Sequence, residues 1–138
     1  MATRLPKNYT PSVDEKFMNA RHKEYFRRKL EAWKEEILQE SAGTLETLQK
    51  ESLKEADVAD RASSETDWSI ELRARDRQRK LIAKIDSALG KLENGEYGYC
   101  VVTGEPISLK RLDARPIATM TLEAQEMHEK MEKVHRDD

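Results

Sequence analysis

Two short carboxylates, Asp57 and Asp60, stand three residues apart in the polar stretch Asp57–Ala62. Paired carboxylates can hold Mg²⁺, but that ion normally takes only one or two protein carboxylates and relies on substrate phosphates for the rest. Aspartate is also common in ordinary turns and helix connections. The spacing therefore leaves two interpretations open, a polar connection between helices or an acidic tip that acts inside another protein's active site.

The single cysteine of the chain begins a second candidate site, Cys100-Val-Val-Thr103-Gly104. This stretch has the outline of a zinc knuckle with threonine in place of the second cysteine. Structural zinc needs four Cys or His ligands, whereas the only other soft ligands nearby are His128 and His135. Because this set is one ligand short, we expect no bound zinc and interpret Cys100 as a small buried hydrophobe.

Other catalytic signatures are missing, because the sequence has no nucleophile elbow, phosphate-binding glycine loop or HExxH motif. We therefore expect no enzymatic activity and no tightly bound cofactor. The net charge is −2, with basic and acidic residues interleaved, which argues against broad binding to DNA or to a membrane surface. The chain lacks an apolar signal core, a run of about 18 apolar residues and a cysteine pair, so we expect a cytoplasmic protein.

Residues 1–20 are predicted to form an N-terminal arm with a short helix. Residues 1–11 contain Pro6 and Pro11 and little apolar content, which is typical of a mobile arm. Ser12 and Glu15 then have the spacing of a capping box, which predicts a short helix through Met18.

Two long helices are predicted over residues 21–93, the first over about 21–53 and the second over about 65–92, with their tip at 55–64. Apolar residues recur at steps of three and four, as expected of helices with one narrow buried seam. Two helices of comparable length joined by a short turn must lie antiparallel. The main seam positions are Phe26, Leu30, Trp33 and Ile37 in the first helix and Trp68, Leu72, Ile82, Ile85, Leu89 and Leu92 in the second.

Residues 94–138 are predicted to form a small base and a C-terminal helix. Aromatic and β-branched residues at 97–102 predict a short strand, with Ile107 and Leu109 pairing back after a turn.

The final helix is predicted from steps of four and three between apolar residues, and its methionine stripe is expected to be buried core at Met120, Met127 and Met131. Together these patterns predict a mainly α fold, a long antiparallel coiled-coil hairpin with a small zinc-finger-like globular base and a C-terminal helix.

Five stretches closely resemble the DksA/TraR family of bacterial RNA polymerase-binding transcription factors. The resemblance covers nearly everything from about Val13 to His128, and the pattern Asp-x-x-Asp-x-Ala is a hallmark of that family. The stretches are Phe26–Trp33, Asp57–Ala62, Glu71–Ile82, Gly95–Cys100 and Arg111–Pro116.

The resemblance implies a coiled coil that enters the secondary channel of the polymerase and brings its tip close to the catalytic centre. Asp57, Asp60 and Ala62 match the functional tip of the family. The leading hypothesis is therefore a non-enzymatic regulator that shortens the life of promoter complexes.

The four zinc-ligand positions of the family fall on Cys100, Thr103, Thr121 and Ala124, so only one ligand remains. The resemblance thus implies a zinc-independent member, in which the same module is held by apolar packing instead of metal.

The family also works with the alarmone ppGpp, the effector of the stringent response, bound between factor and polymerase. Arg77, Lys84 and Arg115 match basic positions of that site, whereas one of its lysines is Gln125 here. Loss of one phosphate partner among several is expected to weaken the affinity for ppGpp without abolishing it.

Two other functions stay open. A factor of the Gre type would place carboxylates near the catalytic metal to stimulate transcript cleavage, and a stand-alone structural coiled coil would merely dimerise. The presence of only Asp57 and Asp60 at the tip, with Ala62, favours the regulator. We expect a monomer whose partners are RNA polymerase and ppGpp, with no sequence-specific DNA binding.

Overall fold

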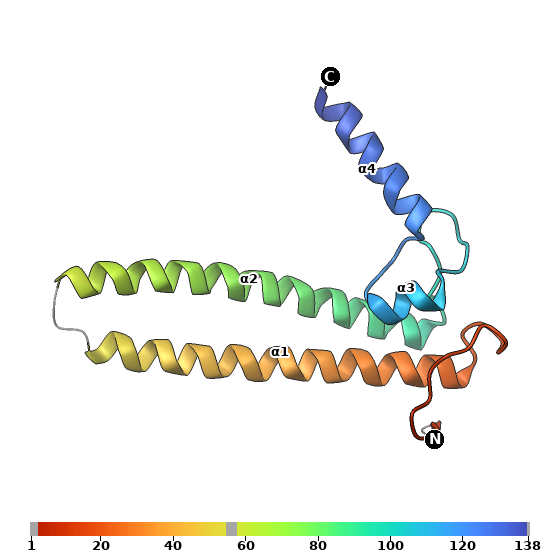
Figure 1. Ribbon diagram of the computed structural model, residues 1–138, viewed down its shortest axis with the longest axis horizontal. Helices are drawn as coiled ribbons and strands as arrows, with labels where there is room; N and C mark the ends of the chain where they lie inside the picture. Colours follow the sequence, from red (N-terminus) through yellow and green to blue (C-terminus); the bar gives the residue numbers. More distant parts are fainter. Residues whose placement is uncertain (1–2, 55–57, 138) are drawn as a thin grey trace. The chain divides into compact units, whose positions relative to one another are not determined.

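The structure, a computed structural model, describes residues 3–54 and 58–137 and, at positions 44, 45, 47–54, 58–64 and 137, only the backbone. Its helices are α1 (Ala20–Lys54), α2 (Val58–Asn94), α3 (Leu109–Ala114) and α4 (Leu122–Asp137), shown in Figure 1. The chain forms two compact units, one of residues 1–30 with 85–138 and the other of residues 31–84. In the described part of the chain, no helix is long and apolar enough to cross a membrane.

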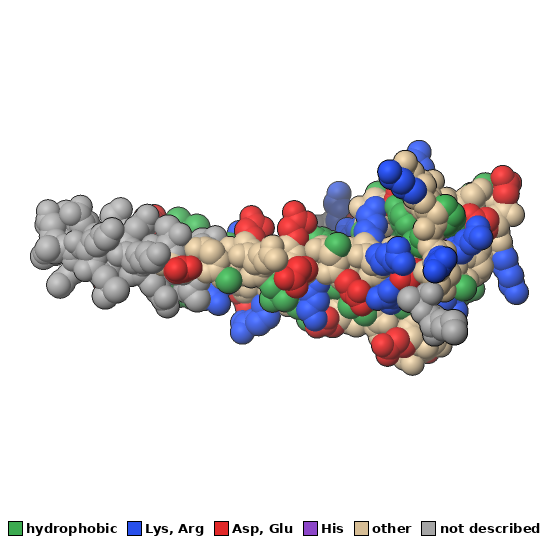
Figure 2. Space-filling model, turned by 90° about the horizontal axis from the view of Figure 1, so that it is seen from below, with side chains coloured by type: hydrophobic (Ala, Val, Ile, Leu, Met, Phe, Trp, Pro, Cys, Tyr) green, Lys and Arg blue, Asp and Glu red, His purple; other side chains and the backbone are tan. Residues whose placement is uncertain are grey.

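The second unit is an antiparallel hairpin of α1 and α2, as predicted (Figure 1). Its seam is narrow, with Ile37 buried and Trp33 and Trp68 half-buried. The Ser41 hydroxyl donates a hydrogen bond across the seam to the side-chain oxygen of Gln78. Figure 2 shows charged side chains of both signs along the described part of this hairpin. Among the described side chains of residues 31–84, Ile37 is the one buried apolar group.

The base has a compact apolar core built from the ends of both long helices and from α3. Phe26 and Leu30 of α1 are fully buried together with Ile85 of α2, Leu112 of α3 and Ile107 of the preceding loop. The core packs in part through aromatic contacts, since the Phe26 and Tyr97 rings lie 5.5 Å apart between centroids.

The short helix predicted from Ser12 to Met18 is wrong, because residues 13–18 form turns. The backbone N–H of Ser12 does donate to Glu15 Oε1 at 3.2 Å, as in a capping box. However, Met18 adopts a left-handed conformation with φ 54°, which interrupts helical geometry. Helix α1 begins only at Ala20, where the Asn19 side chain accepts hydrogen bonds from the first turn.

Two further boundaries differ from the prediction. Helix α2 begins at Val58 and not at about residue 65. The expected strand pairing is reduced to a single bridge between Tyr99 and Pro106, because the backbone N–H of Gly104 turns back onto the Cys100 carbonyl at 2.8 Å. Beyond that point Val101 donates its N–H to Thr119 and its side chain is exposed, so no strand continues.

The predicted burial of the methionine stripe on α4 is also wrong. Met127 and Met131 are 64% and 55% exposed, and Met120 is only half-buried. Residues 126–136 are all exposed, because α4 leaves the base after its first turn. Periodicity correctly predicts an amphipathic helix here, but the apolar face has no partner among the described residues.

A pair of substitutions tests this placement of the core. Leu30→Ala should lower the free energy of unfolding by about 2–5 kcal/mol, because it leaves a cavity in a fully buried site. Met127→Ala removes a side chain of similar size from an exposed face and should change the free energy of unfolding by less than about 0.5 kcal/mol. Urea unfolding of both variants provides the measurement, and equal losses would contradict the assignment.

Candidate functional site

The acidic tip is only partly described. Asp57 lies outside the described residues. Asp60 and Ala62 belong to the first two turns of α2, where only the backbone is described, and that backbone is helical. The connection between the two long helices is therefore shorter than the predicted tip of residues 55–64.

The four positions that match zinc ligands do gather in the base. Cys100 is buried, and its sulfur lies 4.0 Å from the hydroxyl of Thr121. The same hydroxyl accepts a hydrogen bond from the Ala124 backbone N–H at 3.2 Å and so caps α4. The Thr103 side chain hydrogen-bonds to Cys100 and accepts from the Glu105 N–H at 3.2 Å. The knuckle, defined as residues 100–104, is thus retained as a turn.

These donors do not fit zinc. A closed structural site needs four thiolate or imidazole ligands, and three of the four positions offer hydroxyl or methyl groups. The two histidines do not complete the set, since His128 Nε2 pairs with Glu132 Oε1 at 3.1 Å on α4. In the described ranges, no three His, Cys, Asp or Glu side chains are grouped as a metal site would require.

The knuckle instead provides hydrogen bonds to a sulfur atom. Burial raises the pKa of the Cys100 thiol. Hydrogen bonds lower this pKa by more than burial raises it, and they come from the Thr103 side chain and from the backbone groups of Thr121, Thr103 and Val102. The net effect lowers the pKa of this thiol to about 6. Cys100 is therefore a poor match for the inert apolar residue predicted from the sequence, although its burial was correctly predicted.

The thiolate fraction of Cys100 should consequently rise through about pH 6, well below the range near 8.5 of an ordinary cysteine. Thr103→Val removes the strongest of the opposing hydrogen bonds and should move the midpoint upward. The ultraviolet absorbance of the thiolate measures the titration midpoint of the parent chain and of Thr103→Val, with Cys100→Ser as the blank. A midpoint of the parent chain at the ordinary value would contradict the proposed hydrogen bonding.

The basic positions predicted for ppGpp lie on both units. Arg77 and Lys84 are exposed on α2 in the hairpin unit, and Arg115 is exposed at the C-terminal end of α3 in the base unit. A cleft of about 590 Å³ in the base is lined by Arg115 and also by Lys110 and Arg111. Lys110 and Arg111 were not predicted as candidates from the sequence. Arg111 begins the stretch Arg111–Pro116 that resembles the family, and Lys110 immediately precedes it.

Helix α3 is held in place by a carboxylate that the sequence analysis did not single out. Asp113 Oδ1 accepts hydrogen bonds from Lys29 Nζ and from the Tyr25 hydroxyl, each at 2.6 Å. These two hydrogen bonds keep the pKa of Asp113 below its usual range, and the bond from Lys29 has the larger effect. The carboxylate thus fixes the helix that carries Lys110 and Arg111 onto α1.

Comparisons with known proteins agree with this arrangement. Residues 22–92 match the family described as "DnaK suppressor protein DksA, N-terminal domain", and residues 95–130 match "Prokaryotic dksA/traR C4-type zinc finger". The chain is 66% identical over 131 residues to the RNA polymerase-binding transcription factor DksA of Caulobacter vibrioides, covering 95% of this chain and 92% of that protein. It is 40% identical to the protein of that name from Escherichia coli K12, over 91% of this chain and 83% of the other.

A solved structure is similar as well. The transcription factor DksA2 from Pseudomonas aeruginosa superposes with a TM-score of 0.80 at 38% identity, covering 89% of this chain and 93% of that one. The predicted fold class and the resemblance to the family are thereby confirmed.

Proposed function

This chain belongs to the DksA/TraR family, and on that premise we propose how it acts. Like its relatives, it is an RNA polymerase-binding regulator of transcription. The hairpin of residues 31–84 enters the secondary channel, and Asp57 and Asp60 at its tip disturb the active-site region and shorten the life of promoter complexes. The protein acts as a non-enzymatic monomer in the cytoplasm and reads no DNA sequence itself.

The observation that carries this proposal is the antiparallel hairpin, in which the acidic stretch of residues 57–62 lies at the start of α2 and immediately before it. The portion of α1 from residue 31 to 54 reaches roughly 35 Å at 1.5 Å per residue. A helical pair of this kind can carry short carboxylates into a narrow channel. Inside such a channel water is scarce, and a charge acts more strongly on its surroundings than in bulk water.

The sides of the hairpin support binding to a protein surface. Leu38, Ile70 and Leu72 are each about half exposed, at 46%, 57% and 54%. Ile70 and Leu72 line a shallow groove together with Arg73 and Arg77. Exposed apolar side chains flanked by arginine are typical of surfaces that a partner covers, because arginine stems also bury well.

We further propose that ppGpp strengthens this action through Arg77, Lys84 and Arg115. Their guanidinium and ammonium groups match phosphate chemistry, and no ion pair within the described residues engages any of the three. Gln125 lacks the charge of a lysine and bonds to Glu129 at 3.0 Å. We therefore expect a weaker response to ppGpp than in relatives with a lysine at that position.

The base should fold without metal, because three of the four ligand positions lack a thiolate and the apolar core and knuckle hydrogen bonds hold it instead. Treatment with a strong chelator should leave the thermal unfolding midpoint unchanged, and metal analysis of the purified chain should find zinc far below one ion per molecule. Stoichiometric zinc, or a fall of many degrees with chelator, would show that other ligands have been recruited.

The tip is tested by Asp60→Asn, which removes charge while keeping shape. Promoter-complex lifetime with purified polymerase should be shortened by the parent chain, more strongly with ppGpp, and should return close to the factor-free value with the variant. Polymerase affinity should change little, because contact area lies along the hairpin and base. Stability should fall by at most about 1 kcal/mol, the usual cost of losing a helix cap.

Asp67→Asn is the matched control, since Asp67 is an exposed aspartate of the same helix beyond the predicted tip. It should shorten promoter-complex lifetime like the parent. If Asp60→Asn bound polymerase and still destabilised the complex as well as the parent, charge at the tip would not be the agent. Cleavage of a backtracked transcript by the parent chain would favour the Gre-type function.

A further inference from the structure

The Asp113 carboxylate of α3 is bonded to two side chains of α1, and we name these three residues the clamp. Asp113 Oδ1 accepts hydrogen bonds from Lys29 Nζ and from the Tyr25 hydroxyl, each at 2.6 Å. The Lys29 ammonium also lies 5.7 Å from the centre of the Tyr25 ring. All three side chains are only half-buried. An ion pair with this exposure contributes little to stability, but its geometry can still direct a short helix.

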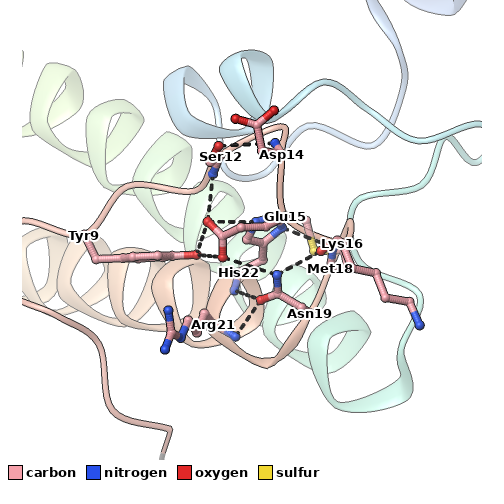
Figure 3. A network of polar contacts seen from close by, with 9 residues as sticks. All are labelled: Tyr9, Ser12, Asp14, Glu15, Lys16, Met18, Asn19, Arg21 and His22. Atoms are coloured by element: carbon pink, nitrogen blue, oxygen red, sulfur yellow. Dashed lines mark hydrogen bonds and ion pairs between the residues drawn. The ribbon is translucent and has the colours of Figure 1, made fainter.

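The Tyr25 hydroxyl is held in a fixed direction by the packing of its ring. The ring meets Phe26 edge-on at 5.2 Å and Tyr9 edge-on at 6.1 Å between centroids. Tyr9 belongs to the segment predicted to be a mobile arm, but its hydroxyl donates to the Glu15 carboxylate at 2.8 and 3.0 Å (Figure 3). Tyr9 is therefore anchored, and Tyr25 offers Asp113 a donor of fixed direction.

Asp113 provides the directional contact that fixes the rotation of α3 about its own axis. The neighbouring residue Leu112 is fully buried, but apolar packing has no preferred direction. Asp113 follows Leu112 by one residue and so lies about 100° further round the helix. Two contacts on different sides fix both the position and the rotation of this six-residue helix. The clamp therefore sets the direction in which Lys110 and Arg111 leave α3.

These two basic residues line the cleft of about 590 Å³ in the base, together with Arg115. Within the described residues, no ion pair engages Lys110 or Arg115. Arg111 donates its Nε–H to the Met120 carbonyl at 2.9 Å, which leaves its two terminal nitrogens for a ligand. A guanidinium group held in this way matches the oxygens of a phosphate group.

Net charge alone gives this cleft little attraction for a phosphate ligand. Glu105 and Glu123 also line it, so that three cations less two carboxylates leave a formal charge of +1. Because so small a charge attracts a polyanion only weakly, the affinity depends on well-directed hydrogen bonds. Such bonds need donors with fixed positions, since ordering a flexible side chain on binding costs affinity.

We propose that Asp113 is a positioning residue for the binding of a phosphate-bearing effector. Held by Lys29 and Tyr25, it orients α3 so that the cations of the cleft receive the phosphate groups of a guanosine polyphosphate. This inference rests on the proposed function, in which ppGpp acts through Arg115, and it adds the basic residues of α3 to the phosphate contacts. The clamp itself does not contact the effector, so its loss lowers affinity without changing what the bound effector does.

The test uses the full chain with purified polymerase and measures promoter-complex lifetime over a range of ppGpp concentrations. Tyr25→Phe removes one hydrogen bond of the clamp and keeps the ring packing, and Lys29→Met removes the other bond. Each variant should raise the ppGpp concentration of half-maximal effect about 3- to 10-fold, the range expected when one ordered side chain becomes mobile. The effect without ppGpp and the effect at saturating ppGpp should equal those of the parent chain.

Two further variants serve as controls. Lys29→Arg keeps a cation that can reach the Asp113 carboxylate, and it should respond to ppGpp like the parent chain. Lys23→Met removes the same charge from an exposed lysine of the same helix, and it should leave the half-maximal concentration unchanged. Agreement of both controls with the parent would assign the shift to the clamp and not to the loss of a positive charge from α1.

The alternatives give different results. A shift with Lys29→Met but none with Tyr25→Phe would mean that the ammonium group contacts the effector directly, and no shift with either would mean that the clamp does not act on binding. Losses of equal size with and without ppGpp would reduce the clamp to a structural contact. Each of these results overturns the proposal. A parent chain that ignores ppGpp would instead refute the proposed action of ppGpp, and the role of the clamp with it.

Discussion

Burial of Phe26, Leu30 and Ile85 against Leu112 and Ile107 is the interaction on which the base depends. These residues come from two long helices, from a loop and from a short helix that is too small to persist alone. Six residues in α3 cannot offset the cost of helix nucleation. The helix exists because Leu112 is buried in this core, and because the Asp113 carboxylate is held by Lys29 and Tyr25.

Much of this architecture was predictable because it depends on periodicity. Phe26 and Leu30 lie one helical turn apart, and this spacing identified both the helix and its buried face. Periodicity cannot identify the partner that covers a face, however, and the methionines of α4 show this directly. Their spacing is that of a core stripe, but Met127 and Met131 are exposed because the helix departs from the base after one turn.

Local polar pairs were the other source of error. Ser12 and Glu15 form the contact expected of a capping box, but the chain uses it to close a turn, and Asn19 caps the helix instead. Capping spacing specifies which groups bond, but it does not specify the backbone conformation of the next residues. The partners of Glu15 and His22 could not be predicted from the sequence for a related reason, since Tyr9 and the Met18 backbone reach them only once residues 9–18 are folded.

Gly98 has a consequence for how the sequence can change. Its φ of 90° disfavours any side chain, and a Cβ there would lie 3.0 Å from Met18 Cε and 3.2 Å from Phe17 Cζ. Positions 17, 18 and 98 therefore share one small volume, although eighty residues separate the glycine from Met18. A substitution at any one of these positions is therefore constrained by the side chains at the other two, so that the N-terminal segment and the loop must change together in evolution.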